Sequence, residues 1–174
     1  QFRSELAGDG ARPNLFQVSL VFPGYVGGAG AARKSTFMCK TAQLPGSTVG
    51  VVEVPYFGRM VKVAGNRVFA EWTVTVINDE DFVIRNAMES WMGVLNSHAG
   101  NIRNPGAINS TSYSVDALVN QYGKAGNIIK SYKFVGLFPT DIAPIDLDWS
   151  SNDTIEDYSI TFDYQYWTSN STDS

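Results

Sequence analysis

The sequence predicts a mainly β protein, a β-sandwich or barrel of about nine strands with one α-helix packed on its side. Polar and apolar residues alternate over most of the 174-residue chain, which is the pattern of half-buried strands. Turn residues separate these stretches, and one segment alone repeats its apolar residues at helical spacing. A chain of this length builds one sizeable core, so residues 1–174 are expected to form a single domain.

The N-terminal residues 1–13 are predicted to form an arm, with one helical turn around Phe2 to Leu6. Arg12-Pro13 then favours extended entry into a strand. Phe16, Val18, Leu20 and Phe22 alternate with polar residues, so this strand is expected over 16–22.

The Gly-rich stretch 23–32 is interpreted as a hairpin connection that leads into a returning strand over 34–41. Its glycines could suggest a phosphate-binding loop. However, the Gly-Lys-Ser/Thr sequence of such loops is missing, and no helix pattern is recognised after the glycines. A flexible loop is therefore the prediction.

The next strands are expected over 49–56, 60–63 and 68–77, with turns at 44–46, 58 and 64–66. In the third of these strands, Trp72, Val74 and Val76 share one face, which indicates the core.

The helical segment is predicted over 79–97, with Asn78 as its N-cap. Its core-facing stripe comprises Ile84, Ala87, Met88, Trp91 and Leu95. A long polar loop, 96–112, follows it and is expected to make contacts.

Strands resume towards the C-terminus. A hairpin with its turn at Gly126-Asn127 joins the first two, and the alternation predicts strands over 113–121, 128–138, 145–149 and 158–166. The polar tail 168–174 is expected to be disordered.

The composition argues against catalysis and against a metal or cofactor site. Cys39 and His98 are the only residues of their types, which excludes an intrachain disulfide and any cluster of several Cys or His ligands. The carboxylate pair Asp146 and Asp148 has an ordinary place on the solvent face of a predicted strand, and no nucleophile elbow is present. No apolar run reaches the ~18–20 residues of a membrane helix, so a soluble protein that does not insert into membranes is expected.

Charge is distributed unevenly along the chain. Residues 1–136 carry thirteen Lys and Arg against nine Asp and Glu, whereas residues 137–174 carry eight Asp and Glu and no Lys or Arg. Such a split suits a subunit whose basic face meets the acidic face of a neighbour. An acidic surface without a partner explains it equally well.

Several segments in this order carry a family resemblance: ARPNLFQV at 11–18, FMCKTA at 37–42, LPG at 44–46, VAGNR at 63–67, WTVTV at 72–76, NDE at 78–80, GLFPT at 136–140 and IDLDW at 145–149. The set resembles the tail tube protein of contractile-tailed bacteriophages, over nearly the whole chain from Ala11 to Trp167. The Gly-rich stretch between Pro23 and Lys34 is the clearest departure from that pattern.

The resemblance implies a structural subunit with no enzymatic activity and no cofactor. Six copies would form a ring, and stacked rings would form a hollow tube inside a contractile sheath, through which DNA enters the host without specific binding. The implied partners are further copies of the chain, the sheath, the baseplate, the tail terminator and the tape measure protein. The implied location is the virion tail, assembled in the host bacterial cytoplasm.

The resemblance also implies an acidic lumen that repels DNA phosphates. The candidate lumen-lining residues are Asp146, Asp148, Asp157 and Asp163. The alternative is that these carboxylates face outward, where they either give solubility or meet basic residues of a neighbouring copy, for which the candidates are Arg59, Lys62 and Arg67.

Two other functions stay open at this point. The tube subunit of a type VI secretion system or another contractile injection system would share fold and assembly. A secreted carbohydrate-binding β-sandwich is a more distant alternative, because the Trp and Tyr residues here alternate into the predicted core rather than onto a binding face.

Overall fold

The protein is described by a computed structural model that covers residues 2–5, 7–26 and 29–172. Its strands are β1 (Phe16–Leu20), β2 (Cys39–Ala42), β3 (Ser47–Tyr56), β4 (Arg59–Phe69), β5 (Trp72–Ile77), β6 (Val115–Tyr122), β7 (Ile128–Ile142), β8 (Asp157–Asp163) and β9 (Tyr166–Ser169). Its helices are α1 (Phe2–Glu5), α2 (Ala29–Met38), α3 (Val83–Leu95) and α4 (Ser110–Tyr113), with single 3-10 turns at Ala7–Asp9 and Pro105–Ala107. The predicted mainly β class is confirmed. No helix in the described ranges is both long and apolar enough to cross a membrane.

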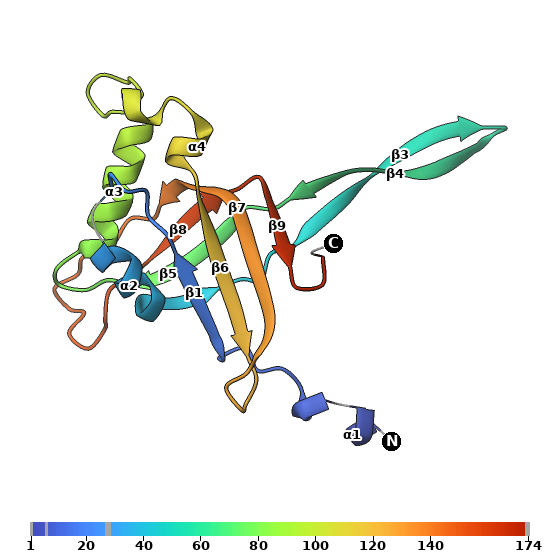
Figure 1. Cartoon of the computed structure of the whole chain (residues 1–174), viewed down its shortest axis with the longest axis horizontal. Coiled ribbons are helices and arrows are strands. Elements are labelled where there is room, and N and C mark those ends of the chain that lie inside the picture. Colours follow the sequence, from blue (N-terminus) through green and yellow to red (C-terminus); the bar gives the residue numbers. More distant parts are fainter. Residues whose placement is uncertain (1, 6, 27–28, 173–174) are drawn as a thin grey trace.

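The body is one strongly curved antiparallel sheet with the order β1-β6-β7-β8-β5-β2, and β9 pairs with β7 (Figure 1). The first part of β7 pairs with β6 and β9, and its last residues pair with β8. Gly136 lies where β7 changes partners and has a φ of 69°, a conformation that side chains with a Cβ rarely adopt. A Cβ there would also come within 2.8 Å of Gln165 Cγ. The bend that folds the sheet over its own core therefore depends on glycine.

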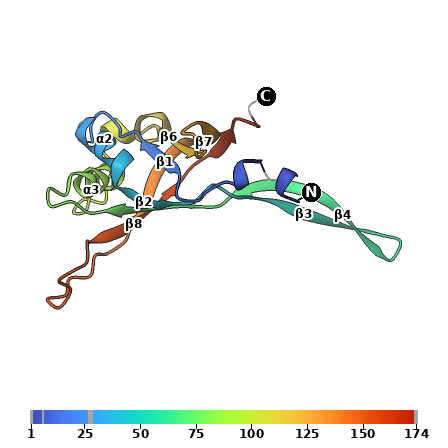
Figure 2. The same cartoon turned by 90° about the horizontal axis from the view of Figure 1, so that it is seen from below.

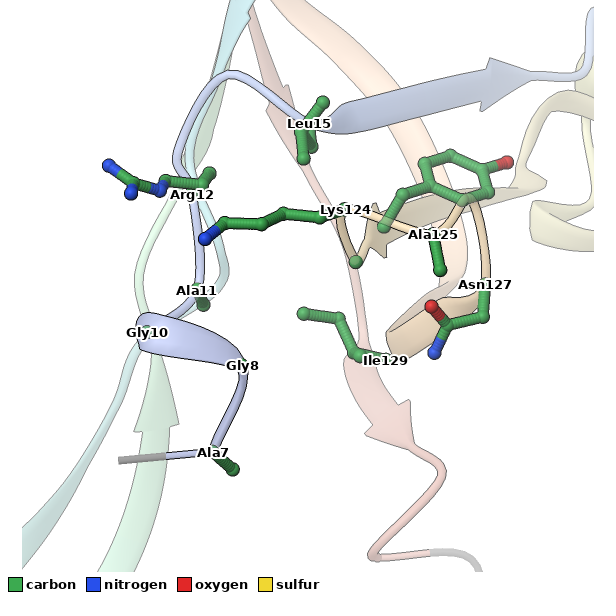
Figure 3. A pocket seen from close by; sticks show the side chains of 12 residues that line it. Ala7, Gly8, Gly10, Ala11, Arg12, Leu15, Lys124, Ala125, Asn127 and Ile129 are labelled. Carbon is green, nitrogen blue, oxygen red and sulfur yellow. The ribbon is translucent and has the colours of Figure 1, made fainter. Parts of the chain in front are cut away.

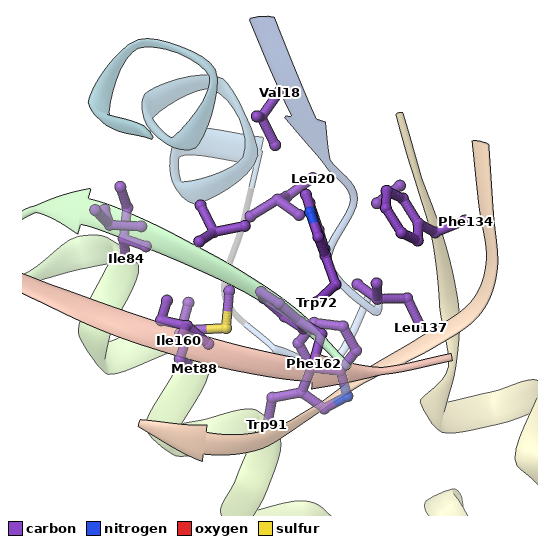
Figure 4. Packing of buried hydrophobic residues seen from close by; sticks show 14 of the residues in the cluster. Val18, Leu20, Trp72, Ile84, Met88, Trp91, Phe134, Leu137, Ile160 and Phe162 are labelled. Atoms are coloured by element: carbon purple, nitrogen blue, oxygen red, sulfur yellow. The ribbon is translucent and has the colours of Figure 1, made fainter. Parts of the chain in front are cut away.

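The core lies between the curved sheet and helices α2 and α3 (Figure 4). Trp72 stacks on Phe134 with ring centroids 4.3 Å apart, and its indole nitrogen donates to the carbonyl of Gln43 at 2.8 Å. Ile84, Ala87, Met88 and Trp91 are buried on the inner face of α3, whereas Leu95 is only half-buried against the core. The predicted helical stripe is therefore confirmed.

Strands β3 and β4 form a long hairpin that leaves the body and extends to one end of the molecule (Figures 1 and 2). The predicted turn at 64–66 is wrong, since β4 runs on to Phe69. The stretch 64–66 lies at a β-bulge, because the register of β3 against β4 shifts between Val49 and Val51. The two strands approach closely there, since a Cβ on Gly65 would lie 3.1 Å from the carbonyl oxygen of Gly50. The predicted strand 68–77 is split, because the chain leaves the hairpin before β5 begins.

A second helix, α2, replaces the Gly-rich hairpin loop and most of the returning strand that were predicted for 23–41. Contacts with β1 and α3 stabilise a helix here. Ser35 is fully buried and donates to the carbonyl of Ala32, and Lys34 forms ion pairs with Asp79 and Asp81 just before α3. A helix thus does follow the glycines, although the missing Gly-Lys-Ser/Thr sequence still separates this segment from phosphate loops. Residues 27–28 lie outside the described part.

Helix α3 begins at Val83 rather than at 79, and Asn78 is not its cap. The carboxylates that were expected in the first turn of this helix lie before it and make other contacts. Those of Asp79 and Asp81 bind Lys34, and the pKa of Asp79 is lowered by its hydrogen bond with Lys34 and by the backbone N–H of Glu80. They tie α2 to the start of α3. The polar loop after α3 includes the short helix α4 and one 3-10 turn.

Two C-terminal predictions need correction. Residues 145–149 are not a strand but part of the largely exposed loop 143–156 between β7 and β8, because no strand within the described ranges pairs with them. The tail expected to be disordered begins in strand β9, where Thr168 pairs with Lys133. Ser169 is buried, and its N–H donates to the hydroxyl of Thr172 at 2.7 Å. Residues 173–174 lie outside the described part.

Burial raises the pKa of the Cys39 thiol to about 12, so the reactive thiolate is scarce at neutral pH. We expect a thiol reagent such as 5,5′-dithiobis(2-nitrobenzoic acid) to label native protein at pH 8 at least about a hundredfold more slowly than unfolded protein, because a model thiol ionises near pH 8.5. Labelling of native protein at the rate of a free thiol would show that the partly buried Cys39 thiol is not shielded. Protein unfolded in guanidinium chloride is the control.

Candidate assembly surfaces

The β3–β4 hairpin exposes apolar side chains on both of its faces. Every residue of β3 is exposed, and β4 is exposed at all but two positions. The large exposed apolar residues of the hairpin are Val49, Val51, Val52, Val54, Tyr56, Phe57, Met60, Val61, Val63 and Val68. An isolated two-stranded hairpin is marginally stable in water, and its unpaired edges are templates for another chain. This surface requires a partner.

The structure brings the three predicted basic residues together on this one hairpin. Arg59 directly follows the turn at the tip, Lys62 lies opposite Glu53, and Arg67 lies opposite Val49 near the body. All three are exposed. Their charges, less that of Glu53, give the hairpin a net charge of +2.

The four predicted acidic residues fall into two separate groups. Asp146 and Asp148 lie in the loop 143–156, which surrounds a hollow of about 420 Å³. Ser150 donates its N–H and its hydroxyl to Asp148, at 3.0 and 2.8 Å, and these bonds lower the pKa of that carboxyl. Beside these charges stand three largely exposed apolar side chains, Leu147, Trp149 and Ile155.

Asp157 and Asp163 lie at the two ends of β8, on its solvent face. Between them this face carries Ser159 and Thr161, whose register partners on β5 are Thr75 and Thr73. The opposite faces of both strands are buried in the core. Helices α2 and α3 lie on the far side of these strands in Figure 2, so the face is open, polar and acidic at its ends. Lys40 Nζ pairs with Asp157 at 2.6 Å.

A further hollow of about 340 Å³ separates the N-terminal arm from the β6–β7 turn (Figure 3). The arm is fixed at its end: the N–H of Tyr122 donates to the carbonyl of Leu15 at 2.8 Å, and Gln121 donates to that of Arg12 at 3.3 Å. Arg12 and Lys124 lie on its two sides. The hollow opens to solvent and offers no catalytic constellation.

Sequence reasoning did not identify the hairpin as the main exposed surface. One signal was present: Val51 and Val52 are adjacent, so both faces of the predicted strand 49–56 were apolar. A strand with two apolar faces belongs either in a buried sheet or at an interface. Among the described residues, no three His, Cys, Asp or Glu side chains come together as metal ligands would.

Comparison with known proteins decides the family. A family model described as the phage tail tube protein matches residues 11–170. The chain belongs to the phage tail tube protein family. It is 35% identical over 162 residues to the tail tube protein gp19 of Enterobacteria phage T4, covering 92% of this chain and 93% of that protein. It is 26% identical over 169 residues to the tail tube protein of Serratia phage KSP90, covering 96% and 93%.

Solved structures share the tail tube fold at lower sequence identity. The tube-terminating cap of the anti-feeding prophage superposes with a TM-score of 0.65 at 16% identity, covering 92% of this chain and 91% of that one. The sheath–tube complex of the extracellular contractile injection system PVC gives 0.61 at 16% identity, covering 98% and 97%. The predicted resemblance is confirmed. This family member is a structural component of the virion tail, and its relatives are tail tube proteins rather than enzymes.

Proposed function

We propose that copies of this chain assemble into rings of six, which stack into a hollow tube that lies inside a contractile sheath and conducts DNA into the host. The β3–β4 hairpin carries this proposal. It exposes apolar side chains on two faces and has no partner within the described part of its own chain. In a ring or stack, neighbouring copies would cover it and turn a site of aggregation into a specific contact.

The comparisons support the number of copies and the partners. A chain of the anti-feeding prophage baseplate, six-fold symmetrised, shares this fold with a TM-score of 0.62 at 11% identity. Other structures with this fold are a sheath–tube complex and a sheath and tube terminator. By analogy we assign this chain the sheath, baseplate and tail terminator as partners, with the tape measure protein inside the tube and assembly in the host bacterial cytoplasm.

A phage tail is favoured over an injection system. The relatives from phages T4 and T6 are 35% and 34% identical over 162 residues, whereas the injection-system structures are 11–16% identical and share the fold alone. Family membership also disfavours the carbohydrate-binding alternative.

The proposal assigns Asp157 and Asp163, on the open face of β8, to the wall of the bore. In a ring, each carboxylate is repeated around the axis, so the negative potential grows with the number of copies. DNA phosphates that pass Ser159, Thr161 and the facing threonines of β5 would meet hydroxyls and carboxylates, and the cation beside this face, Lys40, is held in an ion pair with Asp157. Asp146 and Asp148 lie on the loop 143–156 instead and are assigned to contacts between copies.

We expect Asp163→Lys to leave tubes intact and to slow DNA ejection, most clearly at low salt, where screening is weak. The physical reason is that one cation per copy, repeated around the bore, binds the phosphates that the carboxylate repels. Ejection is followed by DNA-dye fluorescence after triggering purified particles, with Asp163→Asn as the charge-neutral control. If Asp163→Lys prevents tube formation, Asp163 lies at a subunit contact and not in the bore.

Sedimentation velocity of the purified chain tests self-assembly itself. Over a series of rising concentrations, the proposal predicts a species of six copies and larger stacked species. A single monomer boundary at every concentration and salt would refute it.

A further inference from the structure

We propose that the tip of the β3–β4 hairpin of one copy docks on the loop 143–156 of a second copy. This inference rests on the proposed self-assembly and specifies which two surfaces meet. The tip consists of residues 56–60, and the receiving surface is the loop with its hollow of about 420 Å³.

The tip is built for contact rather than for a stable turn. Phe57 and Gly58 form its two-residue turn, with Tyr56 paired to Arg59, and both turn residues have positive φ, 44° and 74°. Asn or Asp is favoured at the first of these positions, and an aromatic side chain there is strained. Phe57 is nevertheless 90% exposed and packs only edge-to-face on Tyr56, at 4.6 Å. A strained, exposed aromatic residue at the end of a long projection indicates a surface that another molecule covers.

The loop 143–156 offers matching apolar chemistry. Trp149 is fully exposed, and Leu147 and Ile155 are 81% and 75% exposed. Large aromatic and aliphatic side chains of this kind anchor protein interfaces when a partner removes them from water. The hollow beside them has a volume of about 420 Å³, which is larger than that of a phenyl ring.

Charge selects the pairing. The hairpin carries +2, whereas residues 143–156 carry four acidic residues and no basic one. Asn78 donates to Glu156, but Asp146 and Asp148 meet no cation among the described residues. Arg59 and Lys62, beside the apolar tip, can therefore pair with Asp146 and Asp148 at the rim while Phe57 enters the hollow. A guanidinium or ammonium group can also stack on the exposed indole of Trp149.

The positions of the two surfaces make the contact head-to-tail. The hairpin tip and the loop 143–156 lie at opposite ends of the long axis in both views (Figures 1 and 2). Two complementary surfaces at opposite ends of one chain form a heterologous contact, in which each copy gives its tip to one neighbour and its loop to another. Growth by this contact has a direction, as a tube with a baseplate end and a terminator end needs.

The test uses the full chain with three changes. R59E/K62E reverses the tip charge, D146K/D148K reverses the loop charge, and Phe57→Asn removes the aromatic tip while improving the turn. Each is expected to raise the concentration at which assemblies appear in sedimentation velocity by at least about tenfold. The controls R12E/R103E and E71K/E80K reverse exposed charges elsewhere on the surface. They are expected to change the concentration at which assemblies appear by no more than about twofold.

Mixing the two charge-reversed proteins distinguishes this contact from others. In an equimolar mixture, the native loop of R59E/K62E meets the native tip of D146K/D148K, and the two reversed surfaces also match. Mixed assemblies should therefore form near the wild-type concentration, although each variant alone needs a concentration at least about tenfold higher. The inference is overturned if wild type assembles and the tip and loop variants do so equally well, or if mixing restores nothing. A wild type that never assembles refutes the proposed function instead.

Thermal melting of the monomeric variants shows whether they still fold. Both surfaces are exposed and lie outside the core, so all three variants are expected to melt within a few degrees of wild type. A variant that unfolds would be replaced by Arg59→Gln or Asp148→Asn, which remove one charge at the same place and should give the same direction of change.

Discussion

Replacing Trp91 by alanine is expected to lower the free energy of unfolding by about 3–5 kcal/mol. The side chain of Trp91 is 1% exposed between α3 and the sheet. Its indole nitrogen donates to the carbonyl of Tyr113 at 2.8 Å, and its ring meets that of Phe22 edge-to-face at 6.0 Å. Alanine would leave a large cavity and a buried carbonyl without its donor.

Urea unfolding of the monomer measures this loss, and Trp149→Ala is its matched control. Trp149 is the same residue type but fully exposed, so its removal should change stability by less than about 0.5 kcal/mol. If Trp91→Ala were no more destabilising than Trp149→Ala, the register of α3 on the core would be wrong.

Deleting the hairpin is expected to abolish assembly and to leave the monomer folded. In the variant, Ser47 is joined to its register partner Phe69 by Asn-Gly, which closes a two-residue turn. Residues 48–68 contribute no side chain to the buried core, whereas Phe69 stays packed near Tyr164 and Trp167. Removal of the hairpin therefore costs little stability and removes the largest exposed apolar surface.

Sedimentation velocity at the highest attainable concentration measures the outcome, and circular dichroism reports the fold. The variant should sediment as a monomer where wild type assembles. Assembly of the deleted variant at the wild-type concentration would show that the hairpin is dispensable.

The sequence predicted best those elements whose patterns are dictated by the core. Alternation in β1, β5 and β8 and the stripe of α3 arise because one face of each is buried, so their core-facing residues were predicted correctly. Their bounds were not: the predicted strands 68–77 and 158–166 are each divided into two strands, and α3 begins at Val83 rather than at 79. Helix α2 was missed because Gly30, Ser35 and Thr36 are weak helix formers and its apolar residues do not form a clear stripe. Its contacts with β1 and α3, rather than local propensity, account for the helix.

The interface elements were misread because most of their apolar residues lie outside the core of their own chain. The alternation of Ile145, Leu147 and Trp149 predicted a strand, yet Leu147 and Trp149 are exposed and unpaired in a loop. The hairpin was misread for a similar reason, because its exposed apolar residues lie on both of its faces rather than on one core-facing side. Residue types and charges were readable from the chain, but their grouping into a basic hairpin at one end and an acidic loop at the other required the topology.

Cryo-electron microscopy of the assembled full-length chain tests the central claim most directly. The account predicts stacked six-fold rings in which neighbouring copies cover the β3–β4 hairpin, with its tip against the loop 143–156 and the open face of β8 towards the bore. Particles in which the hairpin stays exposed to solvent, or a protein that forms no ring at all, would contradict it.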